Sequence, residues 1–128
     1  KTMVTVEIKR EVIEGLLSYA AYAHPREAIL LLRGKARKDA ILIEELIVPP
    51  LATHGQGFAS FNSNMLPIDF SIVGVAHSHP SGHRDPSTGD LNRIYGRLMT
   101  IAAHPYRSKE DVAVYDREGE RIEYQVIP

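Results

Sequence analysis

The chain has 128 residues, of which 44% are hydrophobic and 24% charged, a composition that suits one globular domain with its own core. The formal net charge of −1 argues against broad nucleic-acid binding, which generally needs a strongly basic surface. The absence of cysteine excludes disulfide scaffolds, thiolate zinc sites and thiol nucleophiles. Apolar runs too short for a bilayer and the lack of a signal-peptide pattern predict a cytoplasmic protein without membrane association.

The first half of the sequence predicts a strand, a helix and a hairpin. Val4–Ile8 alternates apolar and polar residues, as a half-buried strand does, and Arg10–Ala23 then changes to helical spacing with one apolar face. The short apolar run Ala28–Leu32 predicts a buried central strand. Ala40–Val48 predicts its hairpin partner across a charged turn, Arg33–Asp39.

The second half of the sequence begins with an irregular segment. Pro49–Asn64 is rich in Pro, Gly, Ser and Asn, which is typical of a mobile loop or flap. Ile72–His77 predicts a second buried strand, and Ser87–Met99 predicts a helix. Two strands, Asp111–Asp116 and Arg121–Ile127, follow. We therefore expect a single α/β domain, a mixed β-sheet flanked by a helix from each half of the chain.

Two histidines close the second buried strand. His77 and His79 are two residues apart, so on a strand their side chains point to one face, about 6.5 Å apart along the axis. Two imidazoles can converge from there on one zinc ion, each at about 2.0–2.1 Å. Asp90 can return to the same place because the loop Pro80–Pro86 is short. Three protein ligands and one open position are the pattern of a catalytic zinc site.

Each of the surrounding polar residues also has a structural interpretation. Ser87 and Asp90 match the capping box Ser-x-x-Asp and could simply start a helix. Glu27, at the edge of an apolar run, could be a surface residue paired with Arg26 or Arg33. The capping and ligand interpretations are compatible, because a capped helix start is a rigid place to mount a ligand.

Five residues in order carry a family resemblance. Glu27 begins an early strand; His77 and His79 form His-x-His, followed directly by proline; Ser87 comes after seven intervening residues, and Asp90 after two more. Together they resemble the signature of the JAMM/MPN+ zinc metalloproteases, in particular the short, prokaryotic-type, deubiquitinase-like members. The resemblance covers nearly the whole chain. It implies that residues 1–128 form one catalytic domain with the MPN, cytidine-deaminase-like fold.

The resemblance also implies a mechanism. It assigns zinc (Zn2+) to His77, His79 and Asp90 with water as the fourth ligand, and zinc lowers the pKa of such a water to about 7. Glu27 is then the general base that takes the water's proton and passes it to the leaving amine. Ser87 stabilises the oxyanion. The implied substrates are conjugates of a ubiquitin-like modifier, cleaved at the isopeptide or peptide bond after its Gly-Gly tail.

Other polar residues receive no catalytic role. Ser78 lies between the two zinc-binding histidines and should point away from the metal by strand alternation. His24 and His104 each precede a proline in an expected turn, and His54 lies in the irregular segment, so all three are assigned to the surface. His83 is expected to be a solvated loop residue.

Four alternatives compete with this interpretation. A zinc nucleobase deaminase needs a Pro-Cys-x-x-Cys that a chain without cysteine cannot supply. An amidohydrolase also uses His-x-His, but on a barrel of about 250 residues. A non-catalytic MPN scaffold and a peptidase that trims a sulfur-carrier protein remain open, as does the oligomeric state, a dimer included. Linkage-selective relatives carry a longer insertion after the helix, often with cysteine, whereas His104–Asp111 is short. This favours a prokaryotic-style enzyme that acts on a small modifier.

The irregular segment carries one further prediction. Gly55 and Gly57 allow bending, and Phe58 and Phe61 offer apolar surface. We expect Phe58–Asn62 to be flexible without substrate and to form a strand against the modifier's tail, because extended peptides commonly bind by adding a strand to a sheet edge. The alternative is an ordinary surface loop whose two Phe side chains enter the core.

Overall fold

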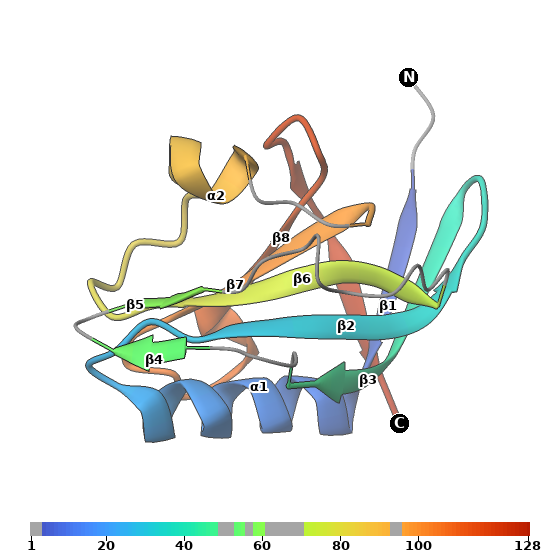
Figure 1. The fold of residues 1–128 in the computed structure, drawn as a ribbon. Helices are drawn as coiled ribbons and strands as arrows, with labels where there is room; N and C mark the ends of the chain where they lie inside the picture. The colour runs from blue at the N-terminus through green and yellow to red at the C-terminus, as the bar shows by residue number, and fades with distance from the viewer. Residues whose placement is uncertain (1–3, 49–52, 56–57, 61–70, 93–95) are drawn as a thin grey trace.

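The computed structural model describes residues 4–48, 53–55, 58–60, 71–92 and 96–128. Eight of its strands form one sheet (Figure 1). They are β1 (Thr5–Lys9), β2 (Ile29–Ala36), β3 (Ala40–Ile47), β6 (Ile72–His79), β7 (Leu98–Ala103), β8 (Val112–Tyr115), β9 (Arg121–Ile122) and β10 (Tyr124–Ile127). A separate hairpin pairs β4 (Thr53–Gly55) with β5 (Phe58–Ser60). The helices are α1 (Arg10–Ala23), α2 (Thr88–Asn92) and the short 3-10 helix η2 (Lys109–Asp111).

The large sheet is mixed and nearly closed. Its order is β10-β1-β3-β2-β6-β7-β8-β9, with parallel pairs at β10/β1, β1/β3 and β6/β7 and antiparallel pairs elsewhere. The two edge strands, β9 and β10, are separated in the chain by Glu123 alone, so the sheet must curl until its edges nearly meet. The expected α/β class with a mixed sheet in a single domain is confirmed. The single strand expected over Arg121–Ile127 is wrong, because the chain changes partner there from β8 to β1.

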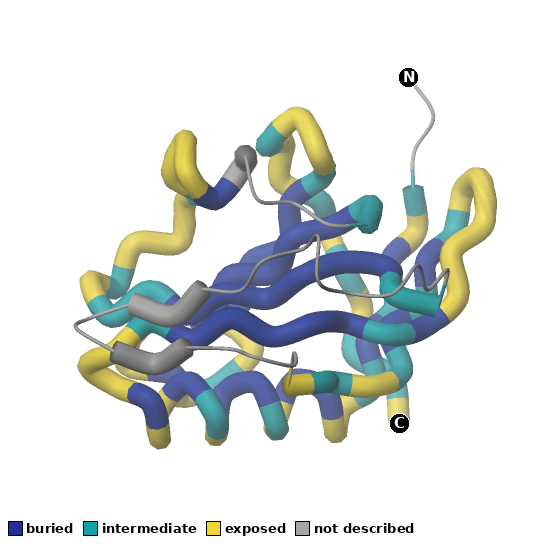
Figure 2. Tube along the Cα trace, in the orientation of Figure 1, coloured by how far each residue is buried: buried dark blue, intermediate teal, exposed yellow. Residues whose placement is uncertain are grey.

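Helix α1 covers one face of the sheet and fixes the main core. The apolar face read from the sequence is buried against β1 and β3; its residues are Val12, Ile13, Leu16, Leu17 and Ala20. Figure 1 shows α1 running along this layer, and Figure 2 shows the buried residues passing through the centre of the sheet. Burying a Leu or Ile side chain stabilises the fold by about 1.5–3 kcal/mol each, so this face holds the sheet that positions the site.

The helix expected over Ser87–Met99 is wrong at its C-terminal end, where the described residues resume at Gly96 and lead into a strand. Helix α2 spans Thr88–Asn92, and β7 begins at Leu98 and runs parallel to β6, from Gly74↔Leu98 to His79↔Ala103. All six residues of β7 are buried, so pairing with β6 and β8 outweighs the local helical spacing. Gly96 makes the entry to β7 feasible. Its φ is +87°, and a Cβ there would lie 2.6 Å from the carbonyl of Val73.

The charged turn expected over Arg33–Asp39 is shorter than predicted. Strand β2 continues through Arg33 to Ala36 and stays paired with β3, so the turn is reduced to residues 37–39. Phe58–Ser60 was expected to form a strand only against a substrate tail, but it is already a strand paired with β4 of the same chain. The rest of the expected strand, residues 61–62, and the two Phe side chains lie outside the described residues, so strand addition by a substrate tail stays a prediction.

None of the helices in the described ranges is long and apolar enough to cross a membrane.

Candidate metal centre

The two histidines predicted to bind zinc lie at the C-terminal end of β6. His77 is 1% exposed and pairs in register with Ile29 of β2 on one side and Ile101 of β7 on the other. His79, two residues on, closes the strand on the same face. Ser78 faces the opposite way, as predicted, and its hydroxyl accepts the backbone N–H of Ala28 at 2.8 Å. Ser78 therefore ties the histidine strand to the segment that begins just after Glu27.

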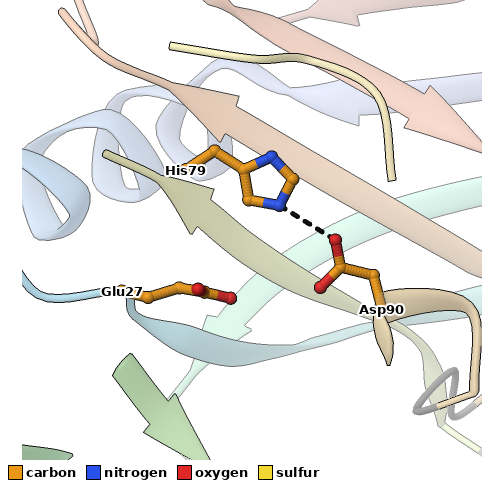
Figure 3. Close-up of side chains that lie close together, drawn as sticks. All are labelled: Glu27, His79 and Asp90. Carbon is orange, nitrogen blue, oxygen red and sulfur yellow. Dashed lines mark hydrogen bonds and ion pairs between the residues drawn. The ribbon is translucent and has the colours of Figure 1, made fainter. Parts of the chain in front are cut away.

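Side chains from three parts of the chain converge at this strand end. His79 Nε2 lies 2.9 Å from Asp90 Oδ2, and His77 Nδ1 lies 3.8 Å from both Asp90 Oδ1 and Glu27 Oε1. Ligand atoms of Glu27, His79 and Asp90 all lie within 4.8 Å of one another. Figure 3 shows the His79 ring directed at Asp90, with the Glu27 side chain extending toward them from the segment just before β2. The structure thus brings all four residues together, while their division into ligands and base stays a prediction.

His77 provides the test of whether a metal fits here. Both of its ring nitrogens are buried and lack a hydrogen-bond partner among the described residues. An unpaired polar atom in a protein interior costs about 1–3 kcal/mol, so such a side chain is normally satisfied by something. Two imidazoles and a carboxylate form a donor set that zinc takes in catalytic sites, with one position left open. The residues present therefore fit a zinc ion.

The predicted capping box of Ser87 and Asp90 is present, and it leaves the Asp90 carboxylate beside both histidines. Ser87 N–H donates to Asp90 Oδ2 at 2.9 Å, and Asp90 N–H donates to Ser87 Oγ at 3.0 Å. The same Asp90 carboxylate contacts His79 and faces His77. Because Ser87 Oγ accepts a backbone N–H, its own hydroxyl proton is left to donate into the cleft.

Charge coupling between His79 and Asp90 defines the electrostatics of the site. Burial alone would lower the pKa of His79, but hydrogen bonds to Asp90 and to the His83 carbonyl, with the charges of Asp90 and Glu27, raise it above the ordinary value. Burial would raise the pKa of Asp90, but the hydrogen bonds from His79 and Ser87, with the charges of the histidines, hold it well below its usual range. In the metal-free protein the pair is therefore stabilised as imidazolium and carboxylate, and a cation replaces that proton when it binds.

An open cleft of about 540 Å³ gives access to these side chains. Its lining combines the convergent acidic and imidazole groups with two rigid prolines and the polar loop after β6; the residues are Pro25, Glu27, His79, Pro80, Ser81, His83, Asp85, Ser87 and Asp90. His83 was expected to be merely solvated, but its backbone carbonyl accepts the His79 Nδ1–H at 2.9 Å. No sequence pattern points to a main-chain contact of this kind.

A cluster of three aromatic rings near Glu27 was not predicted from the sequence. His24 and His104 are exposed, as expected, but their rings stack with centroids 4.5 Å apart, and Tyr106 meets both rings edge-on. His24 Nδ1 lies 3.0 Å from the Tyr106 hydroxyl. Burial, and then the negative charge of Glu27, raise the pKa of Tyr106, so the cluster borders the site. The two His-Pro dipeptides, at 24–25 and 104–105, are the signal that could have indicated it.

Comparison with known proteins accounts for this arrangement. A family model described as prokaryotic homologs of the JAB domain matches residues 9–118. The chain belongs to the JAB/MPN family. A probable metalloprotease of Haloferax volcanii is 31% identical to this JAB domain over 129 residues, which cover 95% of this chain and 80% of the relative.

Solved structures of other family members superpose on this JAB domain. A JAB1/MPN domain protein from Archaeoglobus fulgidus is 30% identical, with a TM-score of 0.69 and coverage of 97% of this chain and 98% of the other. A structure described as a JAMM metalloprotease-like zinc site in the proteasome and signalosome is also 30% identical, with a TM-score of 0.68 and coverage of 99% and 100%. A protein from Desulfitobacterium hafniense, 17% identical with a TM-score of 0.62 over 96% and 93%, shares the fold.

Proposed function

We propose that this JAB domain is a zinc-dependent isopeptidase that cleaves after the Gly-Gly tail of a ubiquitin-like modifier attached to lysine. The observation that carries the proposal is His77, a buried imidazole with both nitrogens unpaired among the described residues, 3.8 Å from two carboxylates and on the same strand face as His79. A complete donor set beside an open cleft also argues against a non-catalytic scaffold. The zinc site named for one solved relative and the metalloprotease name of another support the same chemistry.

His77, His79 and Asp90 would hold the ion, which when bound supplies a Lewis acid and lowers the pKa of a water molecule to about 7. Asp90 is preorganised for this role because the Ser87 N–H fixes one of its oxygens. The His83 carbonyl orients His79 by accepting a hydrogen bond from its Nδ1.

Glu27 performs the proton transfers in the proposed reaction. Its side chain is 24% exposed and its Oε1 faces His77, so it borders both the ligands and the cleft. A carboxylate in this place can take a proton from water and later deliver it to the leaving amine of the lysine. Ser87 lines the same cleft with a hydroxyl proton free to donate, and it would hydrogen-bond the oxygen that becomes negative when the carbonyl is attacked.

The choice of a Gly-Gly tail rests on the resemblance to the JAMM/MPN+ family. The cleft supports it with two rigid prolyl rings, Pro25 and Pro80, in the same lining as Glu27 and His79. The shortness of the segment 104–111 and the absence of cysteine support a small modifier and modest linkage selectivity.

The test uses zinc-loaded protein and a panel of lysine conjugates of small modifier proteins. We expect cleavage of a conjugate whose modifier ends in Gly-Gly, little cleavage when that tail is Ala-Ala, and none by Glu27→Gln. Glu45→Gln is the matched control, because Glu45 lies on β3 and pairs with Arg33 outside the cleft. Cleavage restricted to a sulfur-carrier precursor with a C-terminal extension would contradict the isopeptidase assignment. Equal cleavage of both tails would contradict the Gly-Gly argument.

A further inference from the structure

The orientation of His79 depends on the position of one loop carbonyl. A carbonyl oxygen can only accept, so the 2.9 Å contact with His83 O requires a hydrogen on His79 Nδ1. Nε2 is then the nitrogen directed at Asp90 and at the metal position. The ring is therefore oriented from one side by Asp90 and from the other by the His83 carbonyl, whose position is set by the loop after β6.

Contacts within this loop are too few to hold that carbonyl. His83 N–H reaches Ser81 Oγ at 3.4 Å, a long hydrogen bond, and Gly82 N–H donates to the His79 carbonyl at 3.1 Å. Both contacts lie on the N-terminal side of the His83 carbonyl, so its position depends on what fixes the chain after it.

The residue that follows is fastened at two points to another part of the fold. Arg84 Nη2 pairs with Asp111 Oδ1 at 3.0 Å, and the Arg84 carbonyl accepts the Tyr115 hydroxyl at 2.5 Å. Tyr115 is 2% exposed on β8, and Asp111 is 7% exposed at the end of η2. The second oxygen of Asp111 accepts the Arg107 N–H at 2.8 Å, so the carboxylate itself is held rigidly.

We propose that Arg84, Asp111 and Tyr115 are positioning residues that fix the His83 carbonyl and, through it, the His79 ring for zinc. This inference rests on the proposed zinc site. Partners behind a metal ligand commonly change metal affinity by about 10–100-fold when they are removed. These residues act through one loop carbonyl rather than by direct contact, so the lower end of that range, about tenfold, is expected.

The principal variant is Asp111→Asn, which keeps the shape and an acceptor for the Arg107 N–H but removes the charge that holds Arg84. Zinc affinity is measured by competition with a chelator, and folding is checked by thermal unfolding of the zinc-free protein. We expect the zinc Kd to rise about tenfold in Asp111→Asn and in Tyr115→Phe. Glu45→Gln, which breaks the exposed Arg33–Glu45 pair, is the matched control and should leave the Kd unchanged. An unchanged Kd in folded Asp111→Asn overturns the proposal.

Two further measurements cover the other outcomes. Arg84→Ala leaves the backbone carbonyl of residue 84 bonded to Tyr115 but removes the pair with Asp111, so it should raise the zinc Kd as much as Asp111→Asn does. The double variant Arg84→Ala/Asp111→Asn should have a zinc Kd no higher than that of either single variant. Additive losses would show that Asp111 does not act through Arg84. In the zinc-free protein, solvent exchange of the His79 Nδ1–H, followed by NMR, should be at least fivefold faster in Arg84→Ala than in the wild type. This exchange rate tests the positioning role even if the wild-type chain binds no zinc. Absence of zinc binding would refute the proposed function but not the positioning role.

Discussion

Ser87 caps helix α2 and is also the proposed oxyanion donor, and Ser87→Ala removes both functions. The hydroxyl accepts the Asp90 N–H at 3.0 Å, and loss of an N-cap of this kind costs about 1 kcal/mol. If the whole of this free energy were lost from zinc binding because Asp90 is less well positioned, the zinc affinity would drop only about fivefold, since a tenfold change in affinity corresponds to about 1.36 kcal/mol. Loss of an oxyanion donor costs far more, about 10²–10³ in kcat. We therefore expect a small effect on metal binding and a large one on turnover.

The assay separates these tasks by measuring kcat at saturating zinc and the zinc Kd by chelator competition. Ser87→Ala should lower kcat by about two to three decades and raise the Kd by no more than about fivefold. Ser87→Thr keeps both the cap and the hydroxyl and is the matched control, with kcat within about tenfold of the wild type. If kcat is unchanged in zinc-saturated Ser87→Ala, Ser87 serves only as a cap and the oxyanion assignment is refuted.

Three other predictions concern the base, the core and the pH dependence of stability. Glu27→Gln should keep one zinc per chain by elemental analysis and lose most turnover, because an amide cannot accept the proton; near-normal turnover would disprove the base. Thr100→Val should raise the thermal midpoint by a few degrees, since the Thr100 hydroxyl is buried without a partner among the described residues; a lower midpoint would indicate a missed contact. In the metal-free protein, the depressed pKa of Asp90 contributes stability that is lost as the pH falls below 3.8, the ordinary pKa of an aspartate. The raised pKa of His79 contributes stability that is lost as the pH rises above 6.5, the ordinary pKa of a histidine. Thermal midpoints measured against pH should therefore be highest between these values, and Asp90→Asn should flatten the profile; an identical profile in that variant would contradict the pairing.

The sequence was sufficient where the deciding interactions are local. Helix α1 follows from its apolar spacing, and the start of α2 follows from Ser87 and Asp90, which are three residues apart and bond to each other. The convergence of His77 and His79 follows from strand alternation once β6 is recognised. These features depend on neighbours in the chain, so a pattern over a few residues is enough to predict them.

Features that depend on distant partners were missed or misplaced. Leu98–Ala103 is buried on both faces, so its sequence does not alternate between apolar and polar residues. Its first two residues, Leu98 and Met99, were therefore assigned to the end of the helix predicted from Ser87. Only pairing with β6 and β8 makes this segment a strand. The split of Arg121–Ile127 between two edges of the sheet likewise follows from closure of the whole sheet.

Parts of the site also fall outside what residue types can reveal. The carbonyl of His83 orients His79 through the main chain, which every residue carries. Ser78 was correctly expected to point away from the two histidines, but its hydrogen bond to Ala28, fifty residues away, could not be read from the strand pattern. The signature residues therefore indicate the chemistry, whereas the contacts that position them emerge only from the fold.

The central claim is that His77 and His79 hold one zinc ion, and zinc stoichiometry tests it most directly. Purified protein is stripped with a chelator, reloaded with zinc, passed through a desalting column and measured by elemental analysis, beside the double variant His77→Ala/His79→Ala. The account predicts one zinc per chain in the wild type and essentially none in the double variant, with both proteins folded by circular dichroism. Full zinc occupancy in the folded double variant, or none in the folded wild type, would contradict it.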